Sequence, residues 1–151
     1  MSFKNKVVIV TGASSGIGAA TALMFAKEGA DVALVAHTQA KLAAVANNIE
    51  ALGRKPLIIQ TDLSKETDTA TVVPETVKHF GKLDVLVNNA GLSSVGSLTE
   101  GTILQEYDEV MRTNVGAVIQ LTSLAAPYLA KTKGDTTGAD RRYSTRFHSY
   151  E

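Results

Sequence analysis

Short apolar runs alternate with longer amphipathic stretches along the first 133 residues of the chain. The short runs are rich in valine, isoleucine and leucine, which is typical of strands buried on both faces of a sheet. The stretches between them carry apolar residues three and four positions apart, which predicts helices. The strands are expected at Lys6–Thr11, Val32–Ala36, Pro56–Gln60 and Leu83–Asn88, and the helices at about 17–28, before Gly53, between Ser64 and Phe80, and at 103–131.

The same spacing predicts which face of each helix is buried. Ile17, Ala20 and Met24 are expected to form the buried face of the first helix. Pro74 lies inside the third helix. It removes one backbone hydrogen bond there at a cost of about 3 kcal/mol, so a kink or a restart is expected. The buried face of the last helix is expected to contain Met111, Val115, Val118, Thr122, Ala125 and Leu129.

Strands that alternate with amphipathic helices predict an α/β fold, with a Rossmann-like parallel sheet and helices on both faces. We expect the sheet to be incomplete, with about four strands, because residues 134–151 contain no apolar run and no helical period. We therefore interpret 1–133 as one domain and 134–151 as a disordered tail. Val85, Leu86 and Val87 would then lie on an open sheet edge, which predicts low stability and poor solubility.

The composition excludes several classes of protein. The chain has 151 residues, a formal net charge of zero and 44% hydrophobic residues, which is typical of one globular domain. The neutral charge favours neither nucleic acid nor a membrane surface as a partner, and acidic residues dilute the basic ones near the C-terminus. The apolar run near the start is too short for a signal peptide or a membrane span, so a cytoplasmic location is expected. The absence of cysteine leaves imidazole and carboxylate groups as metal ligands, and we predict no metal site from them.

A glycine-rich stretch, TGASSGIG, connects the first predicted strand to the first predicted helix at Thr11–Gly18. Its first glycine allows a sharp turn, its second a close approach to a pyrophosphate, and its third close packing of helix on strand. The helix N-terminus adds free N–H groups and the positive end of the helix dipole. A glycine turn without a ligand is the alternative, but the strand–turn–helix context favours a phosphate-binding loop. The candidate contacts are Gly12, Ser14, Ser15, Gly16, Ile17 and Gly18.

Three further motifs follow this loop in order along the chain. They are Asp62-Leu63 after the third strand, Asn88-Asn89-Ala90-Gly91 after the fourth strand, and Asn114 in the last helix. Together with the G-x-x-x-G-x-G spacing, they resemble the short-chain dehydrogenase/reductase family over about Lys4–Gly134.

This resemblance implies an oxidoreductase that interconverts a small carbonyl and an alcohol with NAD(P)(H). It implies that Asp62 and Leu63 bind adenine, and that Asn114 holds a water relay toward a catalytic lysine. Taken singly, each asparagine is better explained as a strand-end cap or a polar helix residue, but the combination with the glycine loop favours the family motif. The residues placed beside the cofactor by the resemblance are Asn88, Ala90 and Gly91.

The end of the second strand bears on the choice of cofactor. An acidic residue there would bind the ribose hydroxyls of NAD and repel the 2′-phosphate of NADP. The sequence has no carboxylate at this place, and His37 and Thr38 are able to meet a phosphate. We therefore expect NADP to be preferred over NAD, with an exposed His37 that has no role as the alternative.

The catalytic serine and the Tyr-x-x-x-Lys pair of the family have no counterpart in the chain. Tyr143 has Phe147 in the lysine place, and Tyr128 has Thr132. One hypothesis is therefore a truncated oxidoreductase that keeps its cofactor-binding half and is not catalytically competent. The other is a non-catalytic fragment that binds nucleotide or pairs with a full-length relative. For such pairing, the resemblance implies an oligomer interface on the 103–131 helix.

Overall fold

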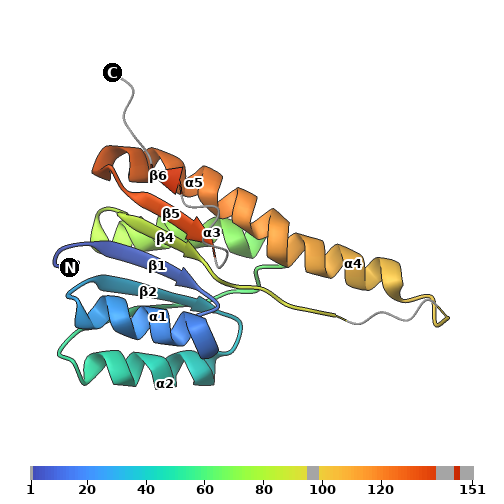
Figure 1. Cartoon of the computed structure of the whole chain (residues 1–151), viewed down its shortest axis with the longest axis horizontal. Coiled ribbons are helices and arrows are strands. Elements are labelled where there is room, and N and C mark those ends of the chain that lie inside the picture. The colour runs from blue at the N-terminus through green and yellow to red at the C-terminus, as the bar shows by residue number, and fades with distance from the viewer. Residues whose placement is uncertain (1, 95–98, 139–144, 147–151) are drawn as a thin grey trace.

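Figure 1 shows a computed structural model of the chain, in which residues 2–94, 99–138 and 145–146 are described. Strands and helices alternate from the N-terminus to β4, and a long helical stretch precedes the last two strands. The strands are β1 (Val7–Thr11), β2 (Asp31–Ala36), β3 (Leu57–Gln60), β4 (Val85–Asn88), β5 (Asp135–Gly138) and β6 (Thr145–Arg146). The helices are α1 (Gly16–Lys27), α2 (Gln39–Glu50), α3 (Glu66–Phe80), α4 (Ile103–Met111), the π-helical segment η1 (Arg112–Gly116) and α5 (Ala117–Thr132).

The strands form one sheet in the order β3-β2-β1-β4-β5-β6. The first five pair in parallel, and β6 pairs antiparallel with β5. The predicted α/β fold, a Rossmann-like parallel sheet with helices on both faces, is confirmed. The strand order reverses between β1 and β4, where doubly wound sheets open a crevice for ligands.

Side chains of each central strand point alternately to the two faces of the sheet, so both faces need apolar cover. In β1, Val8 and Val10 pack under α1 and α2, whereas Val7 and Ile9 join the core on the opposite face. Figure 1 shows α1 and α2 lying together beside the sheet. The opposite face is covered by α3 and α5 through Val72, Val73, Leu121, Ala125 and Leu129.

The expectation of an open edge at β4 is wrong, because β5 pairs with β4 along its whole length. Asp135–Gly138 is a polar strand, but its side chains are not all exposed. Thr136 is buried, and its hydroxyl donates to the backbone oxygen of Leu86 at 3.4 Å. The sheet therefore has five parallel strands where about four were expected. Residues 139–144 and 147–151 of the expected tail lie outside the described residues.

Two expectations about the helices also fail. The buried face of α1 consists of Gly18, Ala22 and Ala26, while Ile17 is 74% and Met24 60% exposed. Small residues face the sheet because α1 packs close to it. The third helix is one continuous element through Pro74, so the expected restart does not occur. Pro74 is exposed, so the carbonyl that loses its helical partner lies on the side where water can bind it.

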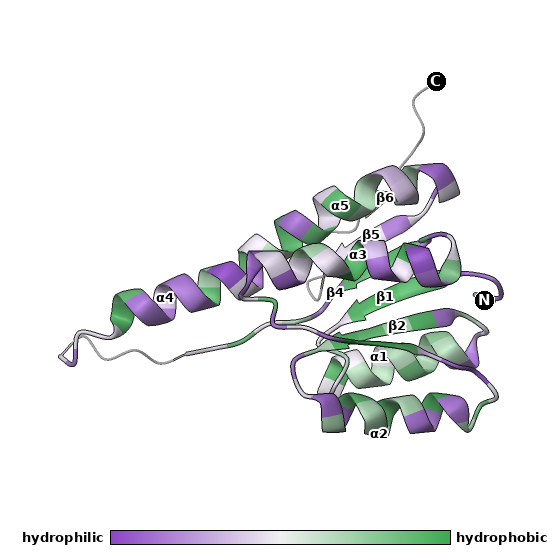
Figure 2. Cartoon of the chain, turned by 180° about the vertical axis from the view of Figure 1, so that it is seen from behind, coloured by the Kyte–Doolittle hydropathy of each residue, from purple (hydrophilic) through white to green (hydrophobic). Residues whose placement is uncertain are grey.

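The expected long helix is divided into α4, η1 and α5. Ala125 and Leu129 are buried as predicted, but Met111 and Val115 are exposed. A π-helical segment adds a residue to the turn, so a constant helical period assigns the wrong face on its N-terminal side. None of the residues of α4 is buried. Figures 1 and 2 show α4 extending away from the sheet, beyond the rest of the molecule.

Candidate functional site

The turn after β1 is shaped by two close backbone contacts. Gly12 has a φ of +65°, and a Cβ there would lie 2.9 Å from the Cα of Ala90. A Cβ on Gly18 would lie 2.2 Å from the backbone oxygen of Gly12. The first turn of α1 therefore packs directly against the loop, as the third glycine of the motif predicts. A Cβ on Gly16 would meet no heavy atom of the described residues within 4 Å, so this side of the loop is open.

The loop is joined to the end of β4 by hydrogen bonds that involve Thr11 and Asn89. The Thr11 hydroxyl accepts the N–H groups of Asn89 and Ala90, each at 2.9 Å, and donates to the oxygen of Val87 at 3.3 Å. The side-chain amide of Asn89 donates to the backbone oxygen of Thr11 at 3.0 Å and of Gly12 at 3.5 Å. These bonds hold the ends of β1 and β4 and the glycine turn in one arrangement.

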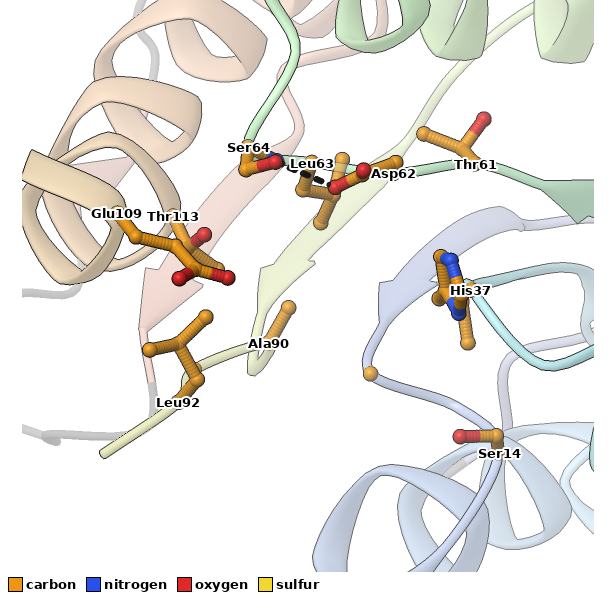
Figure 3. A pocket seen from close by; sticks show the side chains of 13 residues that line it. Ser14, His37, Thr61, Asp62, Leu63, Ser64, Ala90, Leu92, Glu109 and Thr113 are labelled. Atoms are coloured by element: carbon orange, nitrogen blue, oxygen red, sulfur yellow. Dashed lines mark hydrogen bonds between the residues drawn. The ribbon is translucent and has the colours of Figure 1, made fainter. Parts of the chain in front are cut away.

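A cavity of about 350 Å³ lies beside this loop, at the carboxyl ends of the strands. Figure 3 shows Ser14 and His37 on one side and Leu92, Glu109 and Thr113 on the other, with Asp62 and its neighbours between them. The loop, three strand ends and the helix that carries Glu109 thus converge on one space. Its lining residues are Gly12, Ser14, Ala36, His37, Thr61, Asp62, Leu63, Ser64, Ala90, Gly91, Leu92, Glu109 and Thr113.

The Asp62 carboxylate is oriented by the residue two positions later. Its Oδ1 accepts the Ser64 hydroxyl at 2.7 Å and the Ser64 N–H at 3.0 Å, and its Oδ2 lies 3.7 Å from Lys65 Nζ. The Ser64 hydroxyl lowers the pKa of Asp62 most, burial opposes it, and the Ser64 N–H and Lys65 lower it further. Asp62 is therefore an ionised acceptor at neutral pH.

The end of β2 has no carboxylate, as read from the sequence. Ala36 is buried, whereas His37 and Thr38 are exposed. His37 lines the cavity, and its backbone oxygen accepts the side-chain amide of Gln60 at 3.2 Å. Thr38 stands at the N-terminus of α2, outside the cavity lining.

Asn114 lies in the π-helical segment and binds the stretch that follows β4. Its Oδ1 accepts the Leu92 N–H at 2.9 Å, and its Nδ2 donates to the Leu92 oxygen at 2.8 Å. The amide thus pairs with both backbone groups of one residue. Leu92 lines the cavity, so Asn114 positions one of its walls without lining it.

The structure brings together seven of the predicted site residues and leaves the others outside the cavity lining. Asn88 is buried, and its Nδ2 donates to the Thr122 hydroxyl at 3.3 Å, toward α5. Its Oδ1 has no partner among the described residues. The predicted residues that line the cavity are Gly12, Ser14, His37, Asp62, Leu63, Ala90 and Gly91; those that do not are Ser15, Gly16, Ile17, Gly18, Thr38, Asn88 and Asn114.

Sequence reasoning missed two kinds of site residue. Thr11 and Asn89 hold the loop, and the TG and NN dipeptides that contain them were the available signals. Glu109 and Thr113 enter from a helix, where four-residue spacing alone marks them as neighbours. The other lining residues that were not predicted are Ala36, Thr61, Ser64 and Leu92.

Among the described residues, no group of three or more histidine, aspartate or glutamate side chains is arranged to hold a metal ion. In the same part of the chain, no helix combines the length and apolar character needed to cross a bilayer.

Curated relatives match most of the chain, but the chain matches only part of each. It is 42% identical over 130 residues to 11-beta-hydroxysteroid dehydrogenase A of Sesamum indicum, covering 85% of this chain and 37% of that protein. It is 42% identical to 11-beta-hydroxysteroid dehydrogenase-like 3 of Arabidopsis thaliana, covering 85% of this chain and 42% of that protein. The chain therefore spans less than half the length of these relatives.

Solved structures of similar proteins have the same fold over nine-tenths of the chain. A short chain dehydrogenase from Burkholderia cenocepacia in complex with NADP superposes with a TM-score of 0.84 at 39% identity, covering 91% of this chain and 56% of that one. A metagenomic short-chain oxidoreductase in complex with NADP gives 0.85 at 34% identity, covering 91% and 63%. The model of the short chain dehydrogenase family matches residues 6–136. With the glycine loop, the Asn89 brace and the strand order all in place, this chain belongs to the short-chain dehydrogenase family.

Proposed function

We propose that residues 1–133 form the dinucleotide-binding part of the chain, to whose sheet β5 adds a strand, and that this part binds NADP(H). One observation carries the proposal: the cavity opens at the carboxyl ends of β1 and β4, where the strand order reverses, and the glycine loop lies along its side. Open α/β sheets bind nucleotides at this place.

The residues present fit such a ligand. The backbone at Gly16 is open, and the first N–H groups of α1 have no partner within the helix, which suits a pyrophosphate. Ser14 and Ser15 add hydroxyl donors to the same loop. Asp62 and Leu63 supply an ionised acceptor and an apolar surface, which suit the base.

The preference for NADP over NAD rests on the end of β2. His37 and Thr38 stand where a carboxylate would repel a 2′-phosphate, and both side chains are exposed to meet one. The two solved relatives described above are complexes with NADP, which supports the same choice.

The proposed reaction class is the family's interconversion of a small carbonyl and an alcohol, in the cytoplasm. The bound nicotinamide supplies or accepts the hydride in that chemistry. In this chain, Asn114 holds the Leu92 wall of the site, but the 151 residues contain no Tyr-x-x-x-Lys to protonate a substrate. We therefore propose that this chain alone binds the dinucleotide without efficient turnover.

Calorimetric titration with NADPH and NADH tests the proposal. NADPH is expected to bind several-fold more tightly, and His37→Asp to weaken NADPH and not NADH, because a carboxylate repels the 2′-phosphate. Lys78→Asp, on the exposed side of α3, is the matched control and should change neither affinity. Absence of binding at millimolar NADPH, or robust NADPH-dependent reduction of carbonyl compounds by this chain, contradicts the proposal.

A second function is favoured by the apolar surface of the α4–α5 stretch. Six apolar side chains there are between 38% and 74% exposed, and none of α4 is buried. Monomeric proteins rarely leave such a continuous patch uncovered, so we propose that this face pairs with a second copy or a full-length relative. The residues are Ile103, Leu104, Tyr107, Met111, Val115 and Ile119.

Light scattering across a concentration series tests this pairing. The wild-type chain should form dimers at micromolar concentration, and the double variant Leu104→Glu, Ile119→Glu should be monomeric, because two charges would be buried in the apolar contact. Gln105→Glu adds a charge to an exposed residue of the same helix and is the control. A wild-type chain that stays monomeric, alone and with a full-length relative, removes this function.

A further inference from the structure

Another cavity lies at the opposite end of α1 from the glycine loop. It is a groove of about 280 Å³, and the described residues that line it are Phe3, Met24, Phe25 and Glu28. The glycine loop leads into the first turn of α1, whereas residues 24–28 form its last turn and C-cap. About 18 Å of helix lies between the two ends, so this groove is separate from the nucleotide cavity.

The aromatic wall of the groove is held in place by contacts within the chain. The ring centroids of Phe3 and Phe25 lie 4.8 Å apart in an edge-to-face arrangement, and both side chains pack against the core under α1. The Phe3 N–H donates to the backbone oxygen of Glu28 at 2.9 Å, which ties the stretch before β1 to the end of α1. The two rings therefore keep their positions without a ligand.

The groove carries one unpaired negative charge. Of its described lining residues, only Glu28 is charged, and its carboxylate has no hydrogen-bond or ion-pair partner in the described part of the chain. The backbone oxygen of Phe25 in the same turn already accepts the Ala30 N–H at 3.0 Å. Lys27 is exposed and does not line the groove. Because the carboxylate stands at the negative end of the α1 dipole, a cation beside it would be stabilised.

The apolar walls favour the same sign of charge. The faces of aromatic rings attract cations, and the thioether of Met24, which is 60% exposed, adapts to apolar groups of varied shape. A neutral molecule would leave the Glu28 charge unpaired, and an anion would be repelled by it. The volume is at the lower end of the range for ligand pockets, which suits one ring with a short chain.

We propose that this groove binds a small organic ammonium cation with an apolar body. The ammonium group pairs with the Glu28 carboxylate, and the apolar body lies against Phe3, Phe25 and Met24. The site does not depend on the NADP(H)-binding function proposed above.

The methionine methyl groups allow this site to be observed directly. The chain has three methionines, of which Met24 lines the groove and Met111 lies on α4. The full chain is labelled with ¹³C in the methionine methyl groups, and the Met24 signal is assigned by its absence from Met24→Leu. It is then titrated with 2-phenylethylammonium, 2-phenylethanol and phenylacetate, which share a ring and differ in charge.

The Met24 signal is expected to shift in a saturable way with 2-phenylethylammonium, while the Met111 signal stays in place. 2-Phenylethanol should bind more weakly and phenylacetate should not bind. Glu28→Gln should weaken 2-phenylethylammonium by about 2- to 5-fold, the range for an exposed charge pair, and leave 2-phenylethanol unchanged. Glu50→Gln is the matched control, because Glu50 is an exposed carboxylate at the end of α2 and lies outside the groove lining.

Three results overturn the proposal. A Met24 signal that does not shift with 2-phenylethylammonium shows that the groove is not a binding site for it. Equal affinities for 2-phenylethylammonium and 2-phenylethanol, or unchanged binding of the ammonium compound to Glu28→Gln, show that the charge of Glu28 has no part in binding. A Met111 signal that shifts together with that of Met24 shows non-specific association with apolar surfaces.

Discussion

Asp84 anchors the end of the sheet opposite the candidate site. Its carboxylate accepts the Val7 N–H at 2.9 Å and pairs with Lys6 at 2.9 Å and Lys82 at 3.0 Å, although only 2% of the residue is exposed. Burial would raise the pKa of Asp84, but these donors together hold it below its ordinary value. The charged form is therefore favoured in the folded chain and joins the start of β1 to the residue before β4.

We expect Asp84→Asn to lower the free energy of unfolding by roughly 2 kcal/mol at pH 7, since a buried charged acceptor is lost. Because the folded pKa is depressed, this stabilisation is complete above the unfolded value of about 3.8 and is lost as the pH falls through the folded pKa. Urea titrations from pH 7 to pH 2 should show this loss in the wild type and not in the variant.

Asp31→Asn is the control for that experiment. Asp31 pairs with Arg54 at 3.2 Å, but both side chains are partly exposed, so the loss should be under about 1 kcal/mol. Equal effects of the two variants would contradict the role given to Asp84.

Gly18→Ala is expected to weaken both the fold and nucleotide binding. The new Cβ would lie 2.2 Å from the Gly12 oxygen, and a backbone carbonyl cannot rotate away as a side chain can. Overpacking of this kind costs about 1–3 kcal/mol and would displace the phosphate loop. Gly116→Ala, whose Cβ would lie 3.7 Å from the Met111 oxygen, should leave both properties intact. Thermal melts and NADPH titrations of the two variants measure these effects. A Gly18→Ala chain that binds NADPH like the wild type would contradict the role given to Gly18.

At the scale of elements, the turn from α5 to β5 positions the fifth strand beside β4. Lys133 ends the helix with a φ of 52°, and the Gly134 N–H donates to the Leu129 oxygen at 2.8 Å. The Asp135 N–H then donates to the Asp84 oxygen at 3.0 Å, which begins the ladder with β4. A Cβ on Gly134 would lie 2.2 Å from that same Asp84 oxygen.

Gly134→Ala should therefore separate β5 from β4. The expected loss of stability is roughly 1–3 kcal/mol, with faster hydrogen exchange of the amides between the two strands. Lys133→Gly is expected to raise the stability, because it relieves a left-handed conformation that costs a lysine about 1 kcal/mol. Exchange rates in Gly134→Ala that match the wild type would show that the strand pairing tolerates the methyl group.

Apolar strands could be predicted from the sequence, whereas a polar one could not. The first four strands consist largely of side chains that need burial on both faces, so their pattern is distinct. Asp135–Gly138 is held by backbone pairing to β4 and by the Thr136 hydroxyl, and neither leaves an apolar signal. The π-helical segment could not be predicted either, because the composition of residues 112–116 does not distinguish them from an α-helix.

The residues of the candidate site also fall into two groups, those that sequence motifs predict and those that they do not. Its loops follow strands and carry motifs, so the glycine turn and the residues at 62–63 and 90–91 could be named in advance. Glu109 and Thr113 line the cavity from the helical stretch beside the strand ends, and that placement depends on tertiary packing. A lone glutamate or threonine on a helix is otherwise the ordinary composition of an exposed surface.

At the scale of the whole molecule, the last described strands protect the sheet. The predicted low stability assumed that Val85, Leu86 and Val87 had an open edge, and β5 covers that edge. Removing residues 134–151 should expose the β4 edge, which lowers the melting temperature and causes aggregation at micromolar concentration. Removing 147–151 alone leaves every described residue in place and is the control. Thermal melts followed by light scattering separate the two chains; identical curves would mean that the β4 edge needs no cover.

Because the Thr11 hydroxyl and the Asn89 amide bind the glycine loop from within the chain, the loop reaches its shape during folding. The conformational entropy of the loop is then lost before any nucleotide arrives, and binding does not have to repeat that loss. Association should accordingly proceed in one kinetic phase, without a slower ordering step after encounter. The same rigidity limits how far the glycine loop can change its shape. A ligand with a different phosphate geometry would therefore have to deform the junction of β1 and β4 in order to bind.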